Sequence, residues 1–262
     1  MEYYTVEKFD SPIIALALHD GHYIPEDLMQ FMLLTESERF KEEDPFTAEM
    51  ANISNVSKVL VSTSRFYTDL NREKEKAMYL KPEDAWGLHV WHEEMPEKAI
   101  RDIRNYYDKF YQDIKALIES TIKQYGYFFI LDIHSYNHRR ESPDMEAALE
   151  THPEINLGTF YNAKKWPPIL SQFKGYVAHC KINNKYPDVR NNIIFKGGGM
   201  AQWVIKNFGE KGGIVSVEFK KTFMDEWTGR VDMQHVLDIN RALKGVVPLM
   251  EFELEKLKEN NR

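Results

Sequence analysis

The chain has 262 residues, which is enough for one large domain with a sizeable core or for two small domains. With 43% hydrophobic and 29% charged residues, its composition is that of an ordinary globular protein. The formal net charge of -7 argues against nucleic acid as the main partner, because binding to phosphates needs a clustered basic surface.

The first half of the chain is predicted to supply two strands and a long helix. An apolar run at residues 11–18 and a β-branched run at residues 58–63 predict buried strands. Apolar residues then recur at helical spacing over residues 96–123, which predicts an amphipathic helix packed against a sheet. Gly126 separates this helix from the next strand, and such a helix-to-strand order is typical of α/β architecture.

The second half opens with an uninterrupted apolar run that starts at Phe128 and ends in a cluster of ionisable side chains at residues 132–140. The run is short and dense, which predicts a strand buried on both faces. Residues 141–170 hold several prolines and are predicted to form a long surface excursion. The remaining predicted elements are strands at residues 177–182 and 213–219 and helices at residues 200–208 and 236–257.

These elements predict one α/β domain over residues 1–262, with a central mixed, mostly parallel sheet and helices on both faces. The N-terminus lacks the basic and apolar regions of a signal peptide, and no apolar run approaches the length of a bilayer span. The single Cys180 fits a reducing compartment. We therefore expect a cytoplasmic protein without a membrane partner, and the sequence leaves its oligomeric state open.

Four predicted strand ends carry side chains suited to catalysis. They are residues 19–22, residues 64–65, residues 132–135 and Glu218. If the strands are parallel, these ends meet at one edge of the sheet, where open α/β folds hold their sites. Two of these strand ends carry histidines and another carries a glutamate. These residue types occur in zinc sites that have three protein ligands and an open coordination position.

Structural roles compete with this interpretation. A histidine at a strand end is more often only hydrogen-bonded, and Glu218 could pair with Lys220 or Lys221 at the surface. Arg65 and Arg72 could be ordinary ion-pair partners on the surface. The apolar neighbours of Glu218 argue against a surface position, since a buried carboxylate needs a compensating partner or a metal. The pattern alone leaves both interpretations open.

Several separate motifs, in this order, resemble the N-formylglutamate amidohydrolase family. They are residues 19–25, 43–44, 64–72 and 132–135, continued by residues 192–198 and the strand of Glu218. The chain is also similar to the zinc carboxypeptidases, to which that family is related, at residues 69–72, 131–136 and 217–220. The resemblance spans most of the chain. It implies a zinc-carboxypeptidase-like (phosphorylase/hydrolase-like) α/β fold and hydrolysis of a linear amide bond.

The resemblance also implies one Zn²⁺ ion, with His19 and His134 as two of its ligands. For the third ligand we favour Asp44 over Glu43. His22 is a competing candidate, because the carboxypeptidases place a ligand glutamate three residues after their first histidine, where this chain has His22. Two imidazoles and a carboxylate suit zinc well, although the sequence does not fix the identity of the metal.

The same resemblance assigns roles in the reaction. Glu218 is implied as the general base and later as the general acid. Arg72, with Asn71, is implied as the group that binds a substrate carboxylate, because a guanidinium donates two parallel hydrogen bonds to its two oxygens. Arg65 is a second guanidinium nearby, suited to a side-chain carboxylate of the substrate or to the carbonyl that is cleaved.

Two runs go beyond the general motifs of the family, at residues 134–140 and 223–229. In the first, Arg139 and Arg140 are predicted either to bind a further acidic group or to belong to a solvated basic loop. These departures indicate a subgroup whose substrate need not be N-formylglutamate, so reaction class transfers better than substrate identity. We expect a metal-dependent amidohydrolase acting on a small acidic N-formyl or N-acyl amino acid. The alternatives are a carboxypeptidase, a deacylase of another peptide-like substrate, or a non-catalytic ligand-binding relative.

Overall fold

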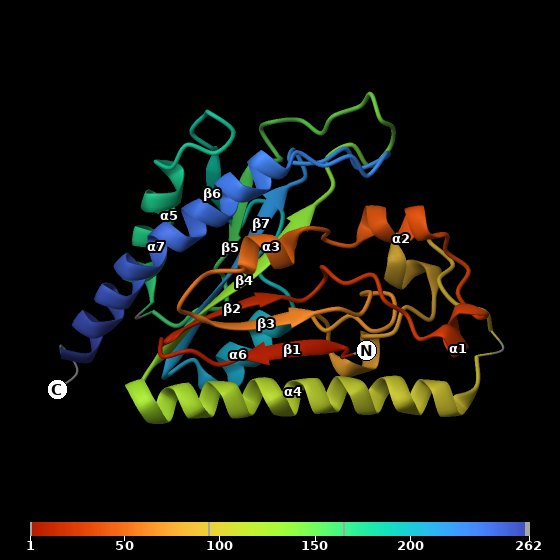
Figure 1. Ribbon diagram of the computed structural model, residues 1–262, viewed down its shortest axis with the longest axis horizontal. Coiled ribbons are helices and arrows are strands. Elements are labelled where there is room, and N and C mark those ends of the chain that lie inside the picture. Colours follow the sequence, from red (N-terminus) through yellow and green to blue (C-terminus); the bar gives the residue numbers. More distant parts are fainter. Residues whose placement is uncertain (1, 94, 165, 260–262) are drawn as a thin grey trace.

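The computed structural model describes residues 2–93, 95–164 and 166–259, and in these residues seven strands form one sheet in the order β1-β3-β2-β4-β7-β5-β6 (Figure 1). The four neighbouring strands in its centre are parallel to one another. They are β3 (Ser57–Val61), β2 (Ile13–Ala17), β4 (Phe128–Tyr136) and β7 (Gly212–Lys220). The predicted mixed, mostly parallel sheet is therefore confirmed, and so are four of the five predicted strands.

The edges of the sheet hold three short strands. At one edge β1 (Tyr4–Glu7) pairs antiparallel with β3. At the other, β5 (Ile155–Gly158) pairs antiparallel with β7, and β6 (Val189–Asn191) pairs parallel with β5. The prediction of a surface excursion over residues 141–170 is wrong for β5, because a four-residue edge strand carries too short an apolar pattern to stand out from a loop.

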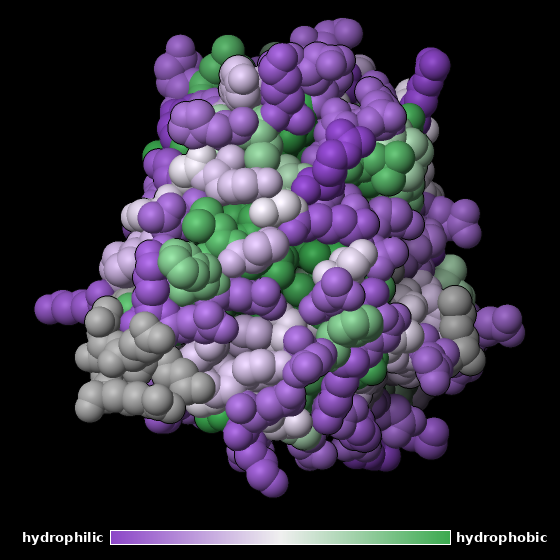
Figure 2. Space-filling view, turned by 60° about the vertical axis from the view of Figure 1, so that its left-hand side comes forward, coloured by the Kyte–Doolittle hydropathy of each residue, from purple (hydrophilic) through white to green (hydrophobic). Residues whose placement is uncertain are grey.

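Helices cover both faces of the sheet (Figure 1). On one face lie α4 (Glu97–Tyr125) and α6 (Gly199–Phe208). On the other lie α3 (Thr47–Ala51), α5 (Pro167–Ala178) and α7 (Met233–Glu259). The predicted strand at residues 177–182 is wrong, since this segment contains the end of α5 and a turn. The view in Figure 2 shows a face that is mostly hydrophilic, with hydrophobic side chains gathered between the hydrophilic ones.

Short helices lie in the loops around the carboxyl edge of the sheet. They are α1 (Glu26–Met29), α2 (Glu36–Glu42), and the 3₁₀ helices η1 (Lys74–Lys76) and η2 (Pro82–Ala85). The helix α2 ends at Glu42, three residues before Pro45, since the residue that precedes a proline avoids the α region. No helix of the described residues is both long and apolar enough to cross a membrane.

Burial on both faces explains the apolar run of β4, whose nine residues are all buried. Successive side chains of a strand point to opposite faces, so Phe129 and Ile133 pack under α5 and α7, while Phe128 and Ile130 pack against α4. The face of Phe128 and Ile130 continues with Asp132 and then His134. The strand thus carries its ionisable residues beyond the helices, to the carboxyl edge of the sheet.

Candidate active site

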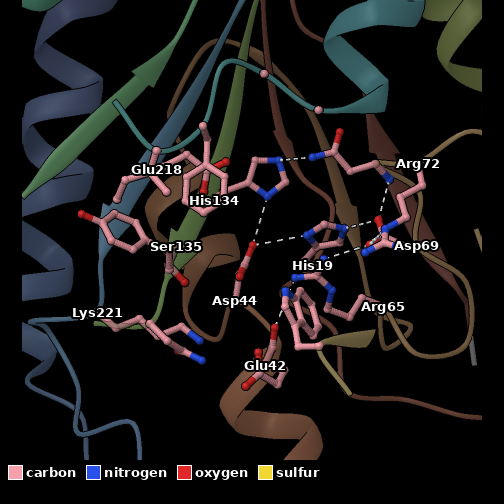
Figure 3. Close-up of a pocket in the computed structure, with 18 of the residues that line it drawn as sticks. His19, Glu42, Asp44, Arg65, Asp69, Arg72, His134, Ser135, Glu218 and Lys221 are labelled. Atoms are coloured by element: carbon pink, nitrogen blue, oxygen red, sulfur yellow. Dashed lines mark hydrogen bonds and ion pairs between the residues drawn. The ribbon is translucent and has the colours of Figure 1, made fainter. Parts of the chain in front are cut away.

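A cavity of about 650 Å³ opens at the carboxyl edge of the four parallel strands. Residues from all four strand ends or from the loops that follow them line it: His19, Arg65, Asn71, Arg72, His134 and Glu218. The predicted meeting of the strand ends is therefore confirmed. Figure 3 shows these side chains around Asp44, with Arg72 and Asp69 on one side of it and Glu218 and Lys221 on the other.

Asp44 and the two histidines form a compact buried group. One ligand atom from each of His19, Asp44 and His134 lies within 4.8 Å of the other two. The Oδ2 atom of Asp44 is 3.0 Å from Nδ1 of His134 and 3.4 Å from Nδ1 of His19. Burial opposes ionisation of Asp44, but the two histidines outweigh it and hold its pKa below the ordinary value. The group thus offers two imidazole nitrogens and an ionised carboxylate.

Each histidine has a second carboxylate close to its Nε2 atom, which in the case of Asp69 is also a hydrogen-bond partner. His19 Nε2 lies 2.7 Å from Oδ1 of Asp69, and His134 Nε2 lies 3.0 Å from Oδ1 of Asp132. Ser216 on β7 in turn donates a hydrogen bond of 3.0 Å to Asp132. A carboxylate behind the ring fixes its orientation and raises its basicity, as is usual for histidines that ligate metals. The donor set and its support therefore fit a divalent ion such as zinc.

The sequence predictions gave no role to Asp69, which connects several parts of the site. It is buried and accepts hydrogen bonds from Arg65 Nη2 at 2.8 Å and from the Tyr79 hydroxyl, in addition to its contact with His19. Burial disfavours its charge, yet His19 and Arg65 hold the pKa of Asp69 well below its ordinary value. Its place four residues after Arg65, inside the 64–72 motif, is a sequence signal for this role.

The position of His19 depends on a close backbone contact. A Cβ atom at Gly21 would lie 2.2 Å from the carbonyl carbon of Ser62, so a glycine is needed where the chain passes the end of β3. The backbone N–H of Asp44 then donates to the carbonyl of His19 at 2.9 Å. These contacts bring the loop after β2 and the loop after α2 together beside β4.

The two other candidates for the third ligand are engaged elsewhere. His22 Nδ1 lies 2.5 Å from Oε2 of Glu43, and Glu43 also accepts a hydrogen bond from the Ser64 hydroxyl. Glu43 is fully buried, whereas 37% of the His22 side chain is exposed. Among the described residues, the group of possible metal ligands contains Asp44 and neither His22 nor Glu43.

Glu218 lies beside His134. The two residues are register partners on the parallel strands β4 and β7, so their side chains leave the sheet on the same face (Figure 3). Glu218 is 8% exposed, and burial raises its pKa to about 8, with Asp44 and Asp132 adding to the shift and His134 opposing it. The buried position argues against the surface role that was left open.

Lys221 lies on the same side of the cavity as Glu218 (Figure 3), and its burial was not predicted from the sequence. It is buried, and its ammonium donates to the backbone carbonyls of Lys41 at 2.7 Å and of Glu43 at 2.6 Å. It therefore holds the carboxyl end of α2, which leads directly into Asp44. A lysine that follows a charged residue in the sequence gives no local signal of such burial.

Asn71 and Arg72 join the cavity to the start of α6. The Asn71 side chain accepts the backbone N–H of Met200 at 3.0 Å, and its Nδ2 lies 3.3 Å from Nε2 of His134. The backbone carbonyl of Asn71 accepts a hydrogen bond of 2.6 Å from the N–H of Gly199. A Cβ atom at Gly199 would lie 2.6 Å from the same carbonyl oxygen. Arg72 is 29% exposed in the cavity wall, with its guanidinium 4.4 Å above the Tyr79 ring.

The two runs that depart from the family motifs contact each other. Glu226 accepts the backbone N–H groups of His138 at 2.6 Å and Arg139 at 3.1 Å, and Trp227 Nε1 donates to the Arg139 carbonyl at 2.8 Å. Arg140 consequently lines the cavity and bonds Glu42 at 2.7 Å. Arg139 points to Asp225, 3.1 Å away, and is not among the described residues of the cavity wall.

The carboxyl edge of this sheet carries two imidazoles, a carboxylate and a buried glutamate, which are side chains suited to a hydrolytic site. The N-formylglutamate amidohydrolase family model matches residues 11–223, so the chain belongs to that family, as its motifs predicted. A search of curated proteins finds no match.

Two solved structures share this fold, and a third matches with a lower score. The N-formylglutamate amidohydrolase of Ralstonia eutropha JMP134 is 14% identical and superposes with a TM-score of 0.72 over 98% of both chains. A gene product of Agrobacterium tumefaciens is 15% identical, with a TM-score of 0.62 over 94% of this chain and 96% of its own. A metallo-carboxypeptidase of Pseudomonas aeruginosa gives a TM-score of 0.41 at 15% identity, over 96% of this chain and 61% of its own.

Proposed function

We propose that this protein is a metal-dependent amidohydrolase that cleaves the linear amide of a small acidic N-formyl or N-acyl amino acid. The observation that carries the proposal is the convergence of two histidine Nδ1 atoms and one Asp44 oxygen beside the buried Glu218. The guanidiniums in the wall of the same cavity support an anionic substrate.

His19, Asp44 and His134 would hold one divalent ion, for which zinc suits the donor set best. When bound, such an ion supplies Lewis acidity, which makes water a nucleophile near neutral pH and polarises a carbonyl. Asp69 and Asp132 keep the two imidazoles oriented with Nδ1 toward the ion.

Glu218 is the proposed general base. Its carboxylate would take a proton from the attacking water and deliver it to the nitrogen of the leaving amine, so that the carbon–nitrogen bond breaks as the amine becomes neutral. Burial raises the pKa of Glu218 above its ordinary value, toward the neutral range in which one group can both accept and release a proton.

The guanidiniums are the proposed binding groups for the substrate. Arg72, with Asn71, would hold a carboxylate, and Arg65 would face either a second carboxylate or the developing oxyanion. Arg140 lines the cavity and would bind a further acidic group. Arg139, through its ion pair with Asp225, would support the loop instead of touching the substrate.

Replacing Glu218 with Gln tests the proposal. Hydrolysis of N-formyl and N-acyl amino acids should fall by about a hundredfold or more while the zinc content stays stoichiometric. The matched control is Glu97→Gln, at a side chain that is 93% exposed on α4, which should keep wild-type turnover. Undiminished turnover in the Glu218 variant would refute the mechanism.

A substrate panel separates the alternative activities. Cleavage of a peptide with a free C-terminal carboxylate would favour a carboxypeptidase, and preference for other acyl groups would favour a deacylase. A protein without bound metal and without any amidase activity would favour a non-catalytic relative. Three expectations stay predictions. They are a single metallohydrolase domain over residues 1–262, a cytoplasmic location and the lack of nucleic-acid or membrane partners.

A further inference from the structure

Trp86 stands out because its backbone is strained and its side chain is half exposed. The residue follows η2 (Pro82–Ala85) with φ 53° and ψ 28°, in the left-handed region that non-glycine residues rarely enter. Its N–H donates to the carbonyl of Pro82, so Trp86 occupies the position after a helical turn where glycine is the usual residue. A glycine at position 86 would make the same turn without strain.

Burial does not explain why a tryptophan occupies this position. The side chain is 47% exposed, although its ring lies 6.0 Å from that of the buried Tyr79. The chain therefore keeps a large apolar side chain at a position where it costs backbone energy and recovers only part of its possible burial. Strained residues of this kind are concentrated at functional sites.

The contacts of Trp86 connect it to the cavity. It lines the wall, with the guanidinium carbon of Arg65 5.0 Å and that of Arg140 5.1 Å from its ring centroid. Both distances are in the range of cation–π attraction. Arg65 is also bonded to Asp69, and Arg140 to Glu42, so each guanidinium is held between a carboxylate and the indole.

The size of the cavity bears on what the indole could contact. Its volume of about 650 Å³ lies in the range of sites that enclose drug-sized ligands. Aromatic or apolar side chains of Trp86, Tyr136, Ile194 and Phe195 belong to its lining. Apolar surface of this kind contributes to binding only if the ligand has an apolar group to place against it.

We propose that Trp86 is a specificity-determining residue, whose indole packs against an apolar acyl group larger than formyl while Arg65 and Arg140 bind the anionic part of the substrate. This inference rests on the proposed amide hydrolysis and extends it to a substrate class: acidic amino acids that carry a bulky N-acyl group. The strained backbone aims the indole into the cavity.

The test compares N-benzoyl-L-glutamate with N-formyl-L-glutamate on the full-length, zinc-loaded protein. The wild type should have the higher kcat/KM for the benzoyl substrate. In Trp86→Gly that preference should fall about tenfold or more, mainly through KM, while Trp86→Phe keeps most of it. The Tm of Trp86→Gly should change little, because the relief of backbone strain offsets the lost partial burial of the ring. Asn55→Gly, at an exposed residue with φ 63°, is the matched control and should leave the preference unchanged.

Three outcomes would overturn the inference. They are a wild type that prefers the formyl substrate, an unchanged preference in Trp86→Gly, and a loss of both activities in proportion to a fall in Tm. A wild type that hydrolyses neither substrate contradicts the proposed function, and calorimetric binding of N-benzoyl-L-glutamate then decides about Trp86. Binding that is at least about tenfold weaker in Trp86→Gly supports its role, whereas equal binding, or none, refutes it.

Discussion

Glu226 and His138 are 88 positions apart in the chain, yet the Glu226 carboxylate accepts the backbone N–H of His138 at 2.6 Å. The same buried carboxylate accepts the N–H of Arg139. It therefore sets the path of the backbone just before Arg140, whose guanidinium reaches the cavity. One segment that was predicted to go beyond the family motifs is thus held by the other such segment.

We predict that Glu226→Ala lowers the free energy of unfolding by about 1–3 kcal/mol, because two backbone N–H groups lose their acceptor. It should also raise KM more than it lowers kcat, since Arg140 is displaced while Glu218 is not. Thermal melts and steady-state kinetics measure both. Glu226→Gln keeps one oxygen acceptor, so its free energy of unfolding and its KM should lie between those of the wild type and those of Glu226→Ala. Wild-type KM in the alanine variant would show that Arg140 does not depend on Glu226.

Asp69→Asn should weaken zinc binding by about 10–100-fold, because the ring of His19 loses the carboxylate that orients it. Competition with a chromogenic chelator gives the affinity directly, without reference to any substrate. Asp132→Asn makes the equivalent change behind His134 and should give a similar loss. Unaltered affinity in both variants would contradict the assignment of His19 and His134 as ligands.

The metal-free protein should be stabilised by Glu218→Gln at neutral and higher pH. The folded-state pKa of Glu218 is about 8, above its ordinary value of 4.5, because burial disfavours the charge. Its contribution to stability is therefore complete below pH 4.5 and is lost as the pH rises toward 8. Urea unfolding in EDTA should show the advantage of the variant growing over this window, to the order of a few kcal/mol. An advantage that does not change with pH would argue against a buried, protonated Glu218.

Lys221→Met should destabilise the protein by about 1–3 kcal/mol and weaken zinc binding. The substitution keeps the apolar stem and removes the ammonium, so the carbonyls of Lys41 and Glu43 lose a donor in a buried place. Asp44 follows Glu43 directly in the chain, so its carboxylate should lose its fixed position when the carbonyl of Glu43 is no longer held. Lys220→Met at the neighbouring residue serves as control for zinc affinity. Destabilisation without any change in zinc affinity would confine Lys221 to a structural role.

The sequence predicted those parts of the site whose evidence is local. His19, His134 and Glu218 each stand at or just beyond an apolar run, and the helix–strand order of the chain predicts parallel strands whose ends meet. If the strands are parallel, this pattern places the three strand ends at one edge of the sheet, but it does not decide whether Glu218 is buried. The central strands and the long helix α4 were predicted for the same reason.

Residues defined by contacts across the chain could not be predicted in this way. Asp44 and Glu43 are neighbours of the same chemical type, and only the folded path after α2 turns one toward the histidines and the other toward His22. The positive φ of Trp86 and the buried ammonium of Lys221 leave no trace in composition or periodicity. The strand β5 was not predicted, because its apolar pattern is only four residues long.

The pairing of β4 with β7 has a consequence for how the site is built. The two strands share a nine-residue register in which every residue is buried, and this register includes His134 and Glu218. Their amide protons should be among the last to exchange with deuterated solvent, whereas those around Trp86 and Arg140, on loops, should exchange early. If Glu218 acts as we propose, bond cleavage takes place in the part of the molecule that opens least often. The proposed recognition residues lie on loops, so a change of substrate would require changes in those loops and none in the two strands.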